Sequence, residues 1–360
     1  MPSYLSRATV ALAVALTAAV ALIVLAPTGD RAPAARTGPV SAAEQWPGAT
    51  RADIPGSVPD GPSYQPVWFL SATDSIGTAP TPDASALRLL RRAADGTVTE
   101  LHRVPLSGNP TYGGFTASAD TFAFSVSVAD GGTTLYALPL AGGAVRRLTG
   151  DTGDIVFFNS QYDMVIAEGR LHWVAVAAGD EPATELRSVA LTGGAVRTTV
   201  QRGAWARAAW PYLVSASNQL GPVQVRNLAT NRVTEVATGG TELATCSSAW
   251  CRVLVLAGDA PARTDLMRPD GTDRRRVIGG DGNAATVDVA ILDRFEIVSA
   301  AGSDNGTTSS QQLFVHDLTT KETVQVATGV GVVICRGGIL WWSTGDVDDT
   351  VWHTLDLRTV

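Results

Sequence analysis

Hydrophobic and polar positions alternate in short runs from Tyr64 to the end of the chain. The runs are rich in Val, Leu and Ala, and turn-forming Gly, Asp, Asn and Pro separate them. This pattern is typical of β-strands joined by tight turns, and no amphipathic helix interrupts it. It predicts an all-β fold.

A strand–turn–strand unit recurs along this region. Its turns carry pairs such as Asp-Gly and Gly-Gly, which tolerate the positive φ angles of tight hairpins. The turn positions are Gly96, Gly143, Gly194, Asn231, Gly271 and Lys321. They are spaced by 47, 51, 37, 40 and 50 residues, and a four-stranded propeller blade takes about 40–50 residues. Two β-prone runs between successive units, such as 163–167 and 172–177, supply the inner strands.

The run 351–357 opens a seventh unit but has no following partner strand. The β-prone stretch 49–54 near the other end is also left without a partner. Pairing these two ends would close a seven-bladed β-propeller and cover an exposed sheet edge. We therefore expect a propeller over residues 46–360, with six blades as the alternative because the spacing varies.

The N-terminal region has a different character. Residues 8–26 are apolar except for Thr9 and Thr17, and a helix of this length rises about 28 Å, close to the roughly 30 Å of a hydrocarbon core. We expect an uncleaved signal anchor or transmembrane segment over residues 1–29, followed by a flexible Ala/Pro-rich tether over 30–45. The alternative is a signal peptide cleaved near Ala35. The anchor predicts a single-pass protein of the cell membrane with an extracellular C-terminal domain, and cleavage predicts a secreted one.

Charge and cysteine content narrow the function classes. The net charge of −7 and pI of about 5.1 argue against a nucleic-acid partner, which requires a basic surface. Cys246 and Cys251 flank a four-residue loop between two β-prone runs. Such positions lie opposite each other in a hairpin, so we expect a disulfide that contributes about 2 kcal/mol. Cys335 lies in an apolar run, and we expect a buried free thiol.

Two segments carry a resemblance to a known family. The units at 135–149 (LYALPLAGGAVRRLT) and 187–194 (RSVALTGG) resemble the WD40-like propeller repeats of TolB-type proteins. The segment 245–253 (TCSSAWCRV) is similar to a hairpin of signal-anchored, TolB-like proteins of actinobacteria. The resemblance implies a propeller at the cell envelope. It transfers no partner, because propellers host many functions, and an evident separate N-terminal α/β domain is lacking.

Candidate catalytic and metal-binding residues are few. No Gly-x-Ser-x-Gly nucleophile elbow is present. His102, His172, His316 and His353 fall in different repeats, so we expect no metal site and no cofactor. Acidic residues recur near the inner strands at Asp163, Asp288 and Asp293. They would either line the channel as a carboxylate cluster, for a cation or a sugar, or fix turns through their side chains.

Two further clusters have alternative readings. The acidic group at Asp346, Asp348 and Asp349 would be either a calcium site or a solvated loop. The tryptophans at Trp341, Trp342 and Trp352 would either fill gaps between blades or form a platform for carbohydrate.

These observations predict a non-catalytic, extracytoplasmic and monomeric propeller. We expect it to act as a scaffold that binds an envelope protein or glycan, and to be attached to the membrane through its N-terminal helix. The alternative is an enzyme, an envelope glycan hydrolase or lyase with its site in the propeller channel.

Overall fold

The computed structural model describes residues 39–360, except 130, 217–222, 280–281, 303–310 and 347. The predicted anchor, its cleavage site and most of the predicted tether therefore lie outside the described residues. Within the described residues, no helix has both the length and the apolar character needed to span a bilayer. Residues Val40–Val360 form one compact unit.

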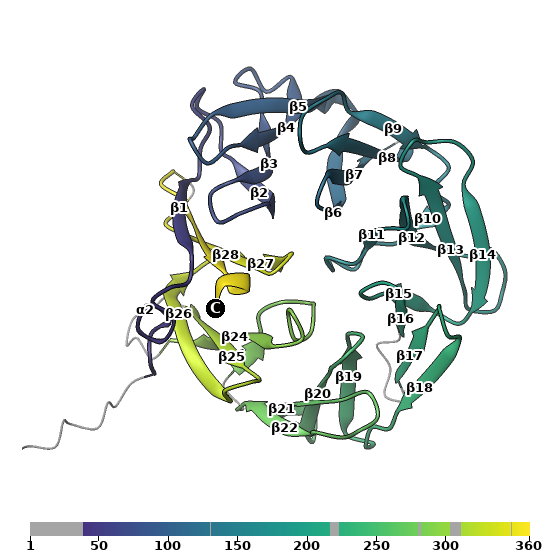
Figure 1. The fold of residues 1–360 in the computed structure, drawn as a ribbon, viewed down its shortest axis with the longest axis vertical. Helices are drawn as coiled ribbons and strands as arrows, with labels where there is room; N and C mark the ends of the chain where they lie inside the picture. Colours follow the sequence, from purple (N-terminus) through teal and green to yellow (C-terminus); the bar gives the residue numbers. More distant parts are fainter. Residues whose placement is uncertain (1–38, 130, 217–222, 280–281, 303–310, 347) are drawn as a thin grey trace, which may run out of the picture. The chain divides into compact units, whose positions relative to one another are not determined.

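Seven antiparallel sheets stand around a common centre and form a seven-bladed β-propeller, as predicted (Figure 1). Blade 1 consists of β2 (Gln65–Phe69), β3 (Ser75–Pro80), β4 (Ala86–Arg92) and β5 (Val98–Pro105). Blade 2 consists of β6 (Thr111–Ala117), β7 (Thr121–Val128), β8 (Gly132–Pro139) and β9 (Arg146–Thr149). Blade 3 consists of β10 (Asp154–Ile155), β11 (Met164–Ala167), β12 (Arg170–Val176), β13 (Ala183–Ala190) and β14 (Arg197–Arg202).

The remaining blades follow the same plan, and the six-bladed alternative is wrong. Blade 4 consists of β15 (Trp205–Arg207), β16 (Tyr212–Ser215), β17 (Val223–Asn227) and β18 (Arg232–Val236), and blade 5 of β19 (Glu242–Cys246), β20 (Cys251–Ala257), β21 (Ala260–Met267) and β22 (Arg275–Ile278). Blade 6 consists of β23 (Gly282–Ala284), β24 (Phe295–Ala301), β25 (Gln311–Asp317) and β26 (Glu322–Val330). Blade 7 consists of β27 (Val333–Arg336), β28 (Ile339–Thr344), β29 (Val351–Asp356) and β1 (Arg51–Pro55). Two short 3-10 helices, Leu106–Gly108 and Leu357–Thr359, complete the set.

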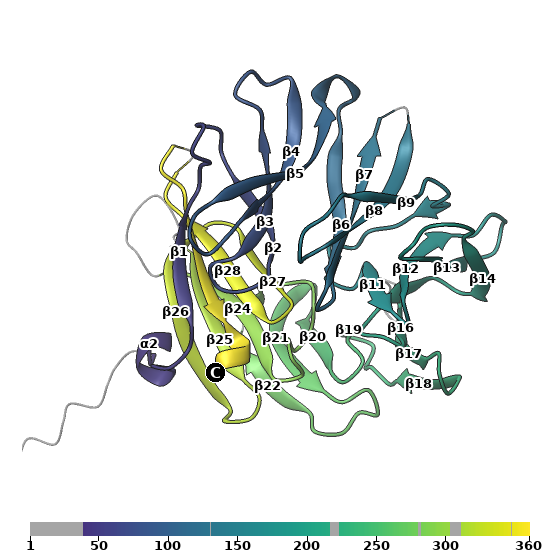
Figure 2. The same cartoon turned by 45° about the horizontal axis from the view of Figure 1, so that its top comes forward.

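Strand β1 closes the ring by pairing antiparallel with β29, from Arg51 opposite Leu355 to Pro55 opposite Val351. Figure 2 shows this N-terminal strand beside the last blade in an oblique view. This is the pairing that the unpartnered last strand predicts. Ile54 is buried with Phe69 and Trp341, so strands from both ends of the sequence share one apolar cluster.

The compact unit that contains the propeller begins at Val40, whereas the sequence predicts a propeller that begins at Trp46. Within the stretch predicted as a tether, helix α2 (Ala42–Gln45) is capped by Ser41 and Glu44. Its Ala42 is buried in the cluster between blades 6 and 7, and the backbone of Gln325 in β26 donates to Val40. The capping box and the buried alanine explain why these residues are ordered against the blade.

Buried apolar clusters join most neighbouring blades. Each contains side chains from both blades: Trp68 with Phe122 for blades 1 and 2, Leu135 with Trp173 for 2 and 3, Val225 with Val253 for 4 and 5, Leu266 with Leu318 for 5 and 6, Phe295 with Trp342 for 6 and 7, and Trp341 with Phe69 for 7 and 1. Among the described residues, no such cluster joins blades 3 and 4.

Candidate functional site

The innermost strand of blade 3 is interrupted by a loop that enters the centre of the ring. β10 and β11 pair with opposite ends of β12, and residues 156–163 between them, here named the plug loop, leave the sheet (Figure 1). The ring of Phe157 lies against Gly114 of blade 2. The side-chain carbonyl oxygen of Gln161 accepts from the backbone of Gly337 in blade 7 at 2.9 Å. The plug loop thus bridges several blades.

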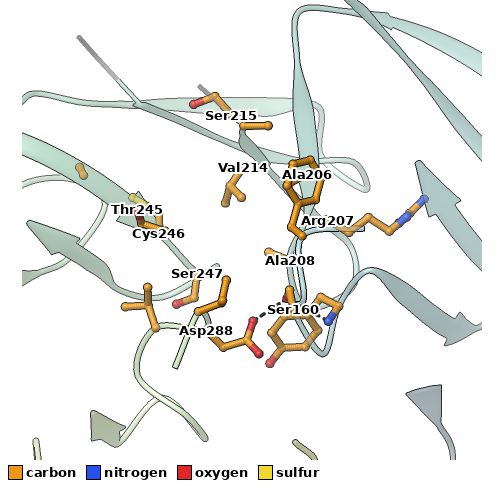
Figure 3. Close-up of a pocket in the computed structure, with 16 residues that line it drawn as sticks. Ser160, Ala206, Arg207, Ala208, Val214, Ser215, Thr245, Cys246, Ser247 and Asp288 are labelled. Atoms are coloured by element: carbon orange, nitrogen blue, oxygen red, sulfur yellow. Dashed lines mark hydrogen bonds between the residues drawn. The ribbon is translucent and has the colours of Figure 1, made fainter. Parts of the chain in front are cut away.

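Asp288, in the loop after β23, fixes the plug loop from blade 6. Its carboxylate accepts from the Ser160 hydroxyl at 2.5 Å and from the Gln161 backbone N–H at 3.0 Å. Both carboxylate oxygens are therefore occupied. Figure 3 shows the Ser160–Asp288 hydrogen bond at the edge of a pocket.

A buried ion pair supports the backbone around Asp288. The Arg252 guanidinium from blade 5 donates to Glu296 at 2.5 Å and to the Asp288 carbonyl at 2.9 Å. Glu296 is fully buried, and its second oxygen accepts from the Ala290 backbone at 2.9 Å. Because the pair is fully hydrogen-bonded, it holds the loop of blade 6 in one conformation.

Asp163 ends the plug loop and is 4% exposed. One carboxyl oxygen accepts from the Phe158 backbone at 2.9 Å. Burial raises the pKa of Asp163 to about 7, and the negative charge of Asp288 contributes in the same direction. Burial also raises the pKa of Asp288. In a poorly solvated site the charged form of a carboxyl group is disfavoured, so Asp163 is partly protonated at neutral pH.

Arg336 of blade 7 is the cation that faces this pair. Its charge lowers the pKa values of both Asp163 and Asp288, against the larger effect of burial. The guanidinium donates to the Val67 carbonyl at 3.1 Å and lies over the ring of Phe115. Its contacts tie the carboxyl pair to blades 1 and 2.

A pocket of about 330 Å³, here named the central pocket, opens beside the plug loop. The small side chains of Ala206, Ala208 and Ala244, on or beside the innermost strands of blades 4 and 5, leave this space unfilled. Hydroxyl groups and aromatic rings make up much of the remaining lining: Ser160, Ser215, Thr245, Ser247, Phe158 and Tyr162. Figure 3 shows Ala206 and Ala208 across the pocket from Ser247, with Asp288 at its lower edge.

The predicted acidic cluster forms in part. Asp163 and Asp288 come together through the plug loop, whereas the side chain of Asp293 is exposed. Asp293 lies in a turn with a φ of 55°, where its backbone carbonyl accepts from the Trp250 ring at 3.1 Å. Sequence reasoning did not identify Ser160, Gln161 or Arg336. The only signal for the first two is that the residues before Asp163 lack a strand pattern.

The other predicted positions are dispersed. The histidines lie in four blades: His102 in β5, His172 in β12, His316 in β25 and His353 in β29. Among the described residues, no group of three His, Cys, Asp or Glu side chains is placed to hold a metal ion.

The predicted disulfide between Cys246 and Cys251 is present, and Cys335 is a buried free thiol, as predicted. The carboxylates of Asp346 and Asp349 accept from backbone N–H groups within their own loop. Trp341 and Trp352 fill the gap between blades 7 and 1, and Trp342 lies between blades 6 and 7. These tryptophans therefore pack between blades.

No protein-family model matches the chain, and no curated protein matches it. Solved structures do resemble it. The propeller is similar to a prolyl endopeptidase, with 12% identity over 86% of this chain and 50% of that one, at a TM-score of 0.51. A puromycin-hydrolyzing peptidase of Mycobacterium tuberculosis has 15% identity over 85% and 55%, at a TM-score of 0.53.

This chain thus spans about half the length of these two peptidases. TolB from Acinetobacter baumannii is also similar, with 10% identity over 72% of this chain and 65% of that one, at a TM-score of 0.38. At such identities the similarity concerns the fold and leaves the activity open. The arrangement of the strands into seven sheets identifies the compact unit of residues 40–360 as a seven-bladed β-propeller.

Proposed function

We propose that this propeller is a non-catalytic binding protein of the cell envelope whose central pocket holds a short stretch of glycan. The observation that carries the proposal is the use of Asp288. Both of its carboxylate oxygens accept hydrogen bonds from the plug loop, so this carboxylate builds a wall of the pocket. A general acid or base would need an oxygen directed at a substrate.

The pocket lining supports a sugar ligand. A sugar ring presents hydroxyl groups at its edge and C–H groups on its faces. Ser215, Thr245 and Ser247 supply hydroxyl partners, and Phe158 and Tyr162 supply aromatic surface. A volume of about 330 Å³ lies at the lower end of the roughly 300–1,000 Å³ that is usual for small-ligand sites.

Two features support a location outside the cytoplasm. The apolar run at residues 8–26 is long enough to anchor the chain in a membrane. The disulfide between Cys246 and Cys251 is of a kind that persists in oxidising compartments. Cell fractionation with protease shaving of intact cells tests this location, and recovery of the intact chain only from the cytosol would contradict it.

Binding is tested by probing the full-length, detergent-solubilised protein on an array of neutral, amino and acidic oligosaccharides. Val287 lines the pocket and is 48% exposed, so Val287→Trp obstructs the entrance at little cost to folding. Val200→Trp is the matched control, because Val200 is 61% exposed on β14 and lies outside the pocket. We expect Val287→Trp alone to lose the array signal. No signal for the unchanged protein, or equal signals for all three proteins, would contradict the proposal.

A second candidate function is cleavage of the glycan by a hydrolase or lyase reaction. The observation that favours it is the Asp163 carboxyl group, with a pKa of about 7 near a second carboxyl group. Glycan-cleaving enzymes commonly tune a carboxyl group to this range. Turnover that Asp163→Asn abolishes without unfolding the protein would establish this function, and full turnover in the variant would exclude it.

A further inference from the structure

Blades 3 and 4 meet differently from the other blades. The described residues include no buried apolar cluster between them, although β12 and β15 are in contact. Arginine side chains lie on the facing sides of both blades instead.

Two of these arginines belong to blade 4. Arg207 borders the central pocket through β15, but Figure 3 shows its side chain running away from that pocket. Its guanidinium carbon lies 5.6 Å from the centre of the Trp210 ring, on which His172 of blade 3 packs with centroids 4.3 Å apart. Residues opposite each other in paired strands share a face. Arg207 is opposite Leu213, and Leu213 is opposite Arg226, so Arg226 faces blade 3 as well.

The other two arginines belong to blade 3. His172, which faces blade 4, is opposite Ser188, and Ser188 is opposite Arg197. Alternate residues of a strand share a face, so Arg170 of β12 lies on the same side as His172. The Arg170 guanidinium donates to the Ser188 hydroxyl at 3.0 Å. The four residues here named the arginine cluster are Arg170, Arg197, Arg207 and Arg226.

Arg207 is the buried end of the arginine cluster, and it has no ion-pair partner within the described residues. It is 5% exposed, and its Nε and Nη1 atoms are enclosed without a hydrogen-bond acceptor. The Nε atom of Arg226 is enclosed in the same way. Arg88 and Arg187, which are also buried, each pair with a carboxylate. A buried cation without a counter-ion is strongly destabilising, so the position of Arg207 favours a bound anion.

The positive charges of the arginine cluster act on one another. Burial and the charges of Arg207 and Arg170 lower the pKa of His172 to about 4, so this imidazole is neutral at pH 7. Burial and the charge of Arg197 lower the pKa of Arg170. Burial lowers the pKa of Arg207 to about 10, which leaves it charged. The arginines are thus near enough to repel one another, and an anion between them relieves that repulsion.

Carboxylates do not neutralise the arginine cluster. Glu168 lies in the turn before β12, and Glu235 lies on the side of β18 that faces blade 3. Both side chains are exposed, and in the part of the chain that the structure describes neither forms an ion pair with the four arginines. Asp180 and Glu181 follow the other end of β12, away from Arg170. The site therefore carries net positive charge.

The arginine cluster reaches solvent. Arg197 is exposed, and Arg170, Arg226 and Trp210 are half-buried. The cluster lies near the start of β12 and β14 and near the end of β15. An anion can therefore approach Arg207 from the face of the ring where these strand ends lie.

We propose that the arginine cluster binds a phosphate group, either as free phosphate or as part of a phosphomonoester. A planar guanidinium group matches two phosphate oxygens at once. A phosphate group carries close to two negative charges at neutral pH, which suits a site with several arginines better than a single carboxylate does. The proposal does not depend on glycan binding in the central pocket.

The test is isothermal titration calorimetry of the full-length, detergent-solubilised protein with three probes: inorganic phosphate, glycerol 3-phosphate and acetate. We expect saturable binding of a phosphate probe at millimolar concentration, and binding of acetate at least tenfold weaker. Tighter binding of glycerol 3-phosphate would support a phosphomonoester as the ligand, and equal or tighter binding of inorganic phosphate would support free phosphate. Failure of both phosphate probes to bind, or binding of acetate as tight as that of phosphate, would overturn the proposal.

Variants locate the site. Arg207→Met and Arg226→Met each remove one positive charge, so we expect each to lose at least tenfold in phosphate affinity. Arg207→Met also removes an unpaired buried charge, so its unfolding temperature without phosphate should be unchanged or higher. Arg226 is less buried, and Arg226→Met therefore tests the site independently of how Arg207→Met folds.

Arg232→Met is the matched control, because Arg232 is an exposed arginine on the opposite face of the same blade. It should retain full phosphate affinity. Full affinity in Arg207→Met or Arg226→Met, or an equal loss in Arg232→Met, would overturn the proposal.

Discussion

The ionisable residues near the ring centre differ in how their charge is compensated. Asp288 accepts two hydrogen bonds and Glu296 pairs with Arg252. The carboxyl group of Asp163 accepts from the Phe158 backbone N–H of its own loop at 2.9 Å, and the side chain is nearly enclosed. The sequence could indicate Asp163 and Asp288, because acidic residues beside inner strands point toward a channel. It could not separate them from Asp293, since exposure depends on the path of each loop.

Replacing Asp163 should change how stability depends on pH. The pKa of Asp163 is about 7 in the folded protein, whereas the ordinary pKa of an aspartate side chain is 3.8. The folded state therefore retains a proton that the unfolded chain releases. Its contribution to the free energy of unfolding is therefore complete below about pH 4. It is lost as the pH rises to about 7, by at most about 1.4 kcal/mol per pH unit.

We therefore expect Asp163→Asn to match the unchanged protein at pH 4 and to be more stable than it at pH 8. Chemical denaturation at a series of pH values measures the difference. Asp293→Asn is the control, because this side chain is exposed. A difference between Asp163→Asn and the unchanged protein that stays constant from pH 4 to pH 8 would show that Asp163 does not titrate as described.

At the scale of single elements, local sequence predicts the hairpins and fails at the plug loop. The outer hairpins follow their turn residues, as at Gly96 and Gly271, both with a φ of 84°. The plug loop instead depends on partners far away in the sequence. Ser160 and Asp288 are 128 residues apart, and Gln161 and Gly337 are 176 apart. Such pairs leave no local pattern in the sequence.

Removing the Asp288 carboxylate should release the plug loop. Hydrogen bonds to a charged group are each worth about 1.5–3 kcal/mol, and 1.4 kcal/mol corresponds to a tenfold change in an equilibrium. We expect Asp288→Ala to raise amide hydrogen exchange within residues 157–162 at least tenfold, as measured by mass spectrometry. Asp346→Ala, which removes an acceptor for Asp348 in an exposed loop of blade 7, should leave this exchange unchanged. Unaltered exchange in Asp288→Ala would mean that other contacts hold the loop.

At the scale of the whole propeller, stability depends on closing the ring. The blade count and the joining of the chain ends follow from counting strands, because one strand at each end is left without a partner. The packing between blades does not follow, since neighbouring blades contribute side chains that lie far apart in the sequence, as with Phe69 of blade 1 and Trp341 of blade 7.

Weakening this closure should destabilise the propeller. Ile54 of β1 is 4% exposed, and truncation of a buried isoleucine to alanine costs about 2–5 kcal/mol. We expect Ile54→Ala to lower the free energy of unfolding by this amount in chemical denaturation. Val233→Ala on the outer strand β18, where the side chain is 42% exposed, should change it by less than about 0.5 kcal/mol. Equal effects of the two substitutions would show that closure contributes little.

We propose that the propeller binds a glycan without cleaving it. The most direct measurement is mass spectrometry of envelope oligosaccharides after incubation with the full-length protein, applied to both the retained and the free fractions. We expect retained oligosaccharides of unchanged mass and no shorter products in either fraction. Shorter products that form with the unchanged protein and are absent with Asp163→Asn would contradict it and identify the propeller as an enzyme.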